Sequence, residues 1–261
     1  MDTMYNRLSR LISTWWFYLL FLLVYFLPSY TALPFDPQNT PELIGLVLSN
    51  PLIYAYPQIM PLFKFIPVVL VAALLLYGKR AGPWFLVYAA LLIAAMAILQ
   101  NTAFTEKYGL AVLTGNIIVY IVVALVWFLE LLQRKTDFSQ PTRSLWRYWV
   151  VPVALLAFWF PVSEATLGPE FSVANLVSNS AGLTTCMMLP LFLAILSLYH
   201  PRVNRITLRI SSYAGLITGL LNVLQWFILT EHWWIGVVHL PLLTIASYTF
   251  WLSFIKISPR K

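Results

Sequence analysis

The chain has 261 residues, of which 61% are hydrophobic and only 10% are charged, and its mean hydropathy is +0.80. So few charges cannot cover a water-soluble globule of this size, which excludes a soluble domain and predicts a bilayer protein. The net charge of +7 does not indicate a nucleic-acid partner, because the basic residues fall in short loops between apolar runs.

Eight apolar runs approach the roughly 20 residues that a helix needs to cross about 30 Å of hydrocarbon. Lipid offers no hydrogen-bond partner to the backbone, so each run is predicted to be helical. In chain order the expected spans cover about residues 14–34, 57–78, 84–104, 110–132, 149–167, 176–199, 208–229 and 233–255. The predicted fold is an all-α, multi-pass membrane protein of about eight transmembrane helices, forming a single membrane domain.

The basic residues sort to one side of these spans. Of the 16 Lys and Arg residues, all except Lys64 and Lys107 lie near the chain ends or in the loops after the second, fourth and sixth spans. The positive-inside rule therefore predicts that both termini are cytoplasmic and that the number of helices is even. We expect the protein to lie in the cell membrane. The opposite side gathers most of the acids, which are Asp36, Glu42, Glu106, Glu164, Glu170 and Glu231.

A polar motif occurs twice. The pattern LQ-x4-TE begins at Leu99 and returns at Leu224, an offset of 125, and two other patterns recur in the same order at offsets of 122 and 133. These matches predict two parallel four-helix repeats, residues 1–135 and residues 136–261, related by an axis along the membrane normal. One further match, at an offset of 129, does not fit this register, so chance resemblance between apolar helices remains the alternative.

Two segments on the acidic side are predicted to be irregular. Repeated prolines between residues 34 and 67 deny that stretch a long regular helix, so it should hold short or broken helical pieces. Its counterpart runs from residue 168 to 179. Each segment either packs at the headgroups as a surface loop or dips inward and lines a cavity. Glu106 and Glu231 are expected in short external turns after the third and seventh helices.

Polar side chains within the spans are the candidates for a binding site. Asn116 is expected about 10 Å inside the fourth helix. His239 is the only histidine well inside a helix, and it either hydrogen-bonds a neighbouring helix or carries a proton. Lys64 either snorkels to the surface or contacts a carboxylate or phosphate. Asn179 and Gln225 complete the predicted substrate site. Near the basic side, Glu130 is expected to pair with Arg134, four residues along its helix.

Motifs of catalysis are absent from the sequence. It contains no metal-binding pattern, no nucleotide-binding loop and no hydrolase nucleophile motif, so neither a metal nor a cofactor is predicted. The single cysteine, Cys186, reads as a buried inert thiol. The first hypothesis is a small-molecule transporter with a site between its two halves, embedded in the lipid bilayer. The alternatives are a membrane enzyme acting on lipid or isoprenoid groups through Glu164, Glu170 or His239, and a non-catalytic subunit that binds a membrane partner or a second copy.

Overall fold

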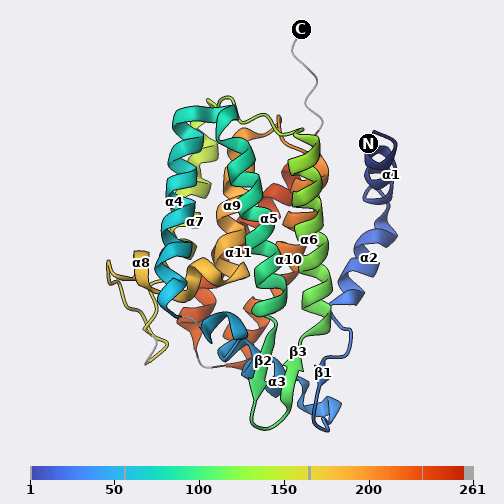
Figure 1. Ribbon diagram of the computed structural model, residues 1–261, viewed down its shortest axis with the longest axis vertical. Coiled ribbons are helices and arrows are strands. Elements are labelled where there is room, and N and C mark those ends of the chain that lie inside the picture. Colours follow the sequence, from blue (N-terminus) through green and yellow to red (C-terminus); the bar gives the residue numbers. More distant parts are fainter. Residues whose placement is uncertain (1, 56, 164–165, 231, 256–261) are drawn as a thin grey trace.

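A computed structural model describes residues 2–55, 57–163, 166–230 and 232–255 as a bundle of helices with a small sheet at one end (Figure 1). The sheet and α3 lie at one end of the bundle, whereas α1 and the end of α11 lie at the other. The bundle consists of α4 (Met60–Tyr77), α5 (Gly82–Leu99), α6 (Thr114–Gln133), α7 (Val150–Trp159), α9 (Thr185–Tyr199), α10 (Arg205–Val223) and α11 (Trp233–Leu252).

The described residues contain five helices long and apolar enough to cross a membrane: Pro57–Arg80, Gly82–Leu99, Thr114–Gln133, Arg205–Leu229 and Trp233–Leu252. Two bent helix pairs raise the number to seven if each pair is one span. They are Tyr5–Leu11 with Trp15–Val24, bent by 83°, and Asn175–Leu183 with Thr185–Tyr199, bent by 96°. The predicted class, a helical membrane protein, is supported. The count of eight and the internal repeat stay predictions.

Short helical pieces fill the irregular segments. The proline-rich stretch after the first span is broken into short elements, as predicted, because each proline removes a backbone donor. These elements are η1 (Pro37–Asn39), α3 (Thr40–Ser49), η2 (Leu52–Ala55) and η3 (Pro57–Ile59). Elsewhere the short pieces are η4 (Gly78–Arg80), η5 (Leu145–Trp149), α8 (Asn175–Ser178), η6 (Ser180–Leu183) and the π-helical η7 (Leu224–Leu229).

A three-stranded antiparallel sheet replaces the ends of three predicted spans, the first of which was expected to reach residue 34, whereas α2 ends at Val24. Its order is β1 (Tyr30–Thr31), β3 (Gly109–Val112), β2 (Thr102–Thr105). The predicted third span ended at residue 104, whereas α5 ends at Leu99. The predicted fourth span began at residue 110, whereas α6 begins at Thr114. The apolar run continues through both strands, so hydropathy alone could not separate strand from helix. Glu106 accordingly lies in the turn of a β-hairpin.

Helix α3 covers this sheet. Its buried residues Leu43 and Val47 pack in one cluster with Ala103, Tyr108 and Ala111 of the hairpin. At the rim, the Lys107 ammonium lies 2.7 Å from a carboxylate oxygen of Glu42, and this hydrogen bond lowers the pKa of the Glu42 carboxyl. The end of the bundle opposite the termini thus has a small hydrophobic core of its own.

The N-terminal helices lie along the outside of the bundle. Helix α1 (Asp2–Leu11) turns by 83° into α2 (Trp15–Val24), and α2 packs against α6. The contact is backbone to backbone at Gly115, where a Cβ atom would lie 2.4 Å from the carbonyl oxygen of Val24. Glycine is therefore required at this crossing for steric reasons.

The expected Glu130–Arg134 ion pair does not form, because the fully buried Glu130 carboxylate is occupied by other donors. It accepts hydrogen bonds from the Thr136 amide, at 2.6 Å, and from the Asn204 side-chain amide. These bonds anchor the loop after α6, and Arg134 closes the helix in a left-handed conformation with a φ of 48°. Glu130 thus fastens a loop to the start of α10.

A continuous apolar core joins the two predicted halves. The fully buried Trp127 packs its ring 5.9 Å from that of Phe85 and 5.6 Å from that of Phe192. Its indole N–H donates to the Ser211 hydroxyl at 2.9 Å. Helices from both halves therefore share one core.

The crossing of α2 and α6 gives a stability prediction. Gly115→Ala should lower the free energy of unfolding by about 1–3 kcal/mol, because the added methyl group forces two backbones apart. Gly45→Ala is the matched control, since no atom lies within 4 Å of its added Cβ. Thermal melting of the purified protein in detergent measures both. The prediction is contradicted if the Gly115→Ala protein has the same melting temperature as the Gly45→Ala protein.

Candidate functional site

Helix α7 ends before it can cross a membrane. With η5 it comprises five and ten residues, and at 1.5 Å per residue these give about 22 Å, short of the roughly 30 Å of hydrocarbon. Phe160 then takes a left-handed conformation with a φ of 51°, and irregular backbone follows. The last carbonyl groups of a helix have no partner within it, and hydrocarbon supplies none. The end of α7 must therefore receive its donors from other parts of the protein.

Three side chains supply those donors. The Lys64 ammonium of α4 donates to the carbonyl oxygen of Phe158 and lies 4.4 Å from the centroid of that ring. The Asn179 amide nitrogen donates to the carbonyl oxygens of Trp159 and Phe160, at 2.8 and 3.1 Å.

The indole of Trp234 donates to the carbonyl oxygen of Pro161 at 2.8 Å. Lys64 is only 1% exposed, so it does not snorkel to the surface. A cation at the carboxyl end of a helix also meets the negative end of the helix dipole.

A second helix end lies close by. Helix α9 begins at Thr185, directly after the 96° bend, and the side-chain oxygen of Gln100 accepts from its amide at 2.9 Å and from its hydroxyl at 2.6 Å. Gly182 brings η6 against α4, because a Cβ there would lie 2.8 Å from the backbone of Phe63. We call this region the helix junction: the end of α7, the start of α9, and Lys64, Asn179 and Gln100.

An apolar cavity adjoins the helix junction. Its volume is about 280 Å³, and three of its lining residues lie next to junction residues in the chain: Phe63 precedes Lys64, Leu99 precedes Gln100, and Leu183 closes η6 just before α9. The full lining is Leu52, Ile53, Ala55, Ile59, Phe63, Ala95, Leu99 and Leu183. The region thus combines polar helix ends with a space suited to an apolar group.

The structure brings two of the five predicted site residues together, Lys64 and Asn179. Asn116 lies elsewhere, in the first turn of α6, and its amide donates to the Asn101 side-chain oxygen at 2.9 Å. The predicted depth of about 10 Å was wrong for Asn116, because the preceding residues form a strand rather than helix. Asn101 in turn donates to the Ala97 carbonyl at 3.0 Å, so the pair joins α5 to α6.

The other two predicted residues belong to the α10–α11 corner. The Nδ1 atom of His239 lies 2.7 Å from the carbonyl oxygen of Ile235, one turn earlier in α11. Its ring lies 6.0 Å from that of Trp226, the neighbour of Gln225 in the π-helical η7. His239 and Gln225 are not among the residues that hydrogen-bond the end of α7 or the start of α9, and their part in a substrate site stays a prediction.

Sequence reasoning predicts a capping or helix-to-helix hydrogen bond for Gln100 but does not identify its partner. The LQ-x4-TE motif singled it out, but its partner Thr185 is 85 residues away, and no local pattern reveals such a contact. A buried polar contact also went unrecognised, in which the hydroxyls of Tyr25 and Tyr120 lie 3.0 and 2.7 Å from that of Thr218. Cys186 accepts a hydrogen bond from the Asn222 amide at 3.2 Å.

The helix junction presents ammonium, amide and hydroxyl groups at the ends of two helices. Among the described residues no group of three or more His, Cys, Asp or Glu side chains could hold a metal ion. Glu170 is exposed on a segment separate from His239, while Glu164 and Glu231 lie outside the described residues. Comparisons of the chain with protein families, with characterised proteins and with solved structures find no match.

The donors at the end of α7 give a second stability prediction. Asn179→Asp removes the amide that serves two carbonyl groups and places a carboxylate against them, so we expect a loss of about 2–3 kcal/mol in the free energy of unfolding. Asn175→Asp makes the same change at a half-buried position, where the amide serves one carbonyl group rather than two, and should cost less. Melting temperatures in detergent compare the two variants. Equal melting temperatures would refute a capping role for Asn179.

Proposed function

We propose that the protein is a transporter of a small amphiphilic molecule, which binds at the helix junction. The supporting observation is that side chains of residues 1–135 hold the end of α7 and the start of α9, and that an apolar cavity lined by Phe63, Leu99 and Leu183 lies close to these residues in the chain. Transporter sites are typically built from discontinuous helices whose ends face the substrate, at the interface of two repeats. The bonds from Lys64 to Phe158 and from Gln100 to Thr185 both cross this interface.

The charges at the helix junction favour a substrate with an acidic or strongly polar head. An ammonium group has three donors, and the Phe158 carbonyl occupies one of those on Lys64. A carboxylate or phosphate can therefore bind to Lys64 while the end of α7 keeps its donor. The apolar cavity of about 280 Å³ receives the rest of the molecule. Recognition thus pairs one charge with one hydrophobic space.

The positions of the helices support two parallel repeats. Helices α4, α5 and α6 begin at residues 60, 82 and 114, and α9, α10 and α11 begin at residues 185, 205 and 233. The offsets are 125, 123 and 119, so the order and spacing of three helices are kept. In this proposal α2 and α7 are the short first helices of the two halves, and the irregular backbone after each helix completes its crossing, which gives eight spans. Rocking of one half against the other exposes the helix junction to each side in turn.

The arrangement of the ends supports the proposed orientation. Helix α1 and the end of α11 lie at the end of the bundle that carries the basic loops after α4, α6 and α9 (Figure 1). We place this end in the cytoplasm, and the sheet with α3 outside the cell membrane, because positively charged loops stay on the cytoplasmic side.

Alternating exposure can be tested with cysteine labelling. Cys186 is the only cysteine, so Cys186→Ser gives a background for single cysteines. Thr184→Cys places a small thiol at the break before α9, where the native side chain is half-buried. We expect a membrane-impermeant, positively charged methanethiosulfonate to modify it from either face of sealed vesicles, because each state opens the site to one side.

Two control positions fix the sidedness of that assay. Val173→Cys, on the exposed outer segment, should react from the outside alone, and Gln140→Cys, in the basic loop, from the inside alone. Reaction of Thr184→Cys from one face only, with both controls behaving as stated, would exclude alternating access at this site. Reaction of Val173→Cys from the inside and of Gln140→Cys from the outside would overturn the proposed orientation of the protein in the membrane.

A further inference from the structure

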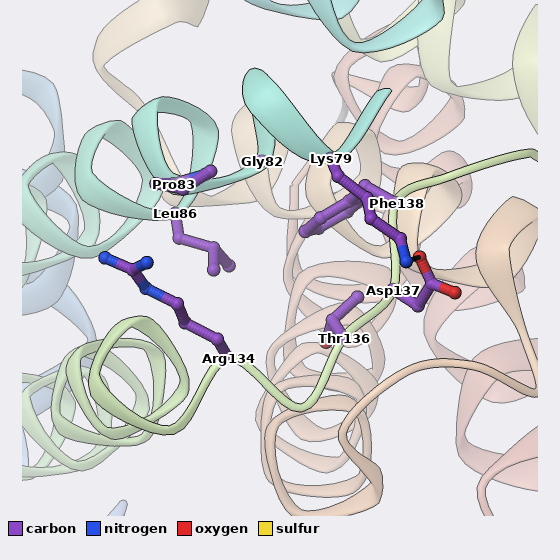
Figure 2. A pocket seen from close by; sticks show the side chains of 8 residues that line it. All are labelled: Lys79, Gly82, Pro83, Leu86, Arg134, Thr136, Asp137 and Phe138. Atoms are coloured by element: carbon purple, nitrogen blue, oxygen red, sulfur yellow. Dashed lines mark ion pairs between the residues drawn. The ribbon is translucent and has the colours of Figure 1, made fainter. Parts of the chain in front are cut away.

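A second cavity lies at the basic end of the bundle, remote from the helix junction. Its volume is about 310 Å³, and it lies between the start of α5 and the loop after α6. Figure 2 shows its lining residues: Lys79, Gly82, Pro83, Leu86, Arg134, Thr136, Asp137 and Phe138. We propose that this cavity binds one anionic phospholipid, with its phosphate on Arg134.

The charge available in this cavity comes mainly from Arg134. Lys79 and Asp137 form an ion pair at 3.5 Å, on the side of the cavity opposite the Arg134 side chain (Figure 2). Asp137 also lies 3.6 Å from Arg202, and hydrogen bonds from Ser139 lower the pKa of its carboxyl, so it stays ionised. Among the described residues no hydrogen bond or ion pair engages the Arg134 guanidinium. Its fork of donors matches the oxygens of a phosphate.

The walls of the cavity are held rigidly. Thr136 is fixed through its amide by Glu130, and its hydroxyl accepts from the Asn204 amide at 3.0 Å. The Phe138 ring packs 5.1 Å from that of Tyr199, and a Cβ on Gly82 would lie 2.7 Å from it. Arg134 therefore leaves α6 at a fixed position, in its left-handed conformation, rather than from a flexible loop. Because its backbone is held, Arg134 has only side-chain freedom to lose when it binds an anion.

The other walls fit lipid chains better than a free phosphate. Pro83, Leu86 and Phe138 are apolar, and α5 begins its apolar course at Gly82, so these residues lie where headgroups meet acyl chains. Trp84 is 70% exposed and lies at the same level of the bundle, as an aromatic residue at the membrane interface does. Basic pockets between helices on the cytoplasmic side bind anionic lipid headgroups. The combination of free cation and apolar wall thus identifies an amphiphilic ligand.

Melting of the purified protein in detergent tests this proposal, with three additives at constant ionic strength. Phosphatidylglycerol should raise Tm, whereas phosphatidylcholine and soluble glycerol 3-phosphate should not. Arg134→Asn keeps a residue that tolerates the left-handed conformation and should weaken phosphatidylglycerol binding about five-fold, as expected for one interfacial cation. Arg80→Gln is the matched control, because Arg80 is an exposed cation of η4 that does not line the cavity, and it should leave the shift in Tm unchanged.

Three outcomes overturn the proposal. Equal losses in Arg134→Asn and Arg80→Gln would show a diffuse charge effect, and an undiminished shift in Arg134→Asn would show that Arg134 does not bind the lipid. A full shift with glycerol 3-phosphate would assign the site to a soluble phosphate compound. The cavity does not include the helix junction, so failure here leaves the proposed transport activity untouched.

Discussion

Backbone carbonyl groups that end a helix inside hydrocarbon must find donors within the protein, and this constraint organises the structure around α7. The helix stops about 22 Å from the start of η5, and Lys64, Asn179 and Trp234 converge on the groups it leaves open. Lys64 lies in α4, Asn179 directly precedes η6, and Trp234 lies in α11. The end of one short helix is therefore bound by three segments that are far apart in the chain. The bend before α9 and the contact at Gly182 follow from the same convergence.

Helix α5 contributes residues to both cavities of the bundle. Gly82 and Leu86, at the start of α5, face the basic cavity, while Ala95 and Leu99, near its end, face the apolar one. The remaining walls differ in kind. A loop anchored by the buried Glu130 carboxylate closes the first cavity, and residues of η2, η3, α4 and η6 close the second. One rigid helix therefore separates a charged interfacial space from an apolar space at the opposite end.

The sequence predicted those features that depend on neighbouring residues. Long apolar helices satisfy their own backbone, so hydropathy located α4, α5, α6, α10 and α11 within a few residues. It failed for β2 and β3, because two apolar strands joined by a turn at Gly109 have the same composition as the ends of helices. Lys64 and Asn179 stood out as polar residues in apolar surroundings. Their convergence on Phe158 and Trp159 could not be predicted, since it depends on contacts between segments far apart in the chain.

The pairing of β1 with β3 constrains the order in which the protein can be assembled. Thr31 pairs with Ala111, so the strand that follows α2 waits for its partner until α4 and α5 have been synthesised. During that interval α2 also lacks its crossing partner at Gly115. Contacts of such long sequence separation form late, because a long loop must close first. The sheet therefore forms late during biogenesis, and its pairing then holds the end of α2 in place.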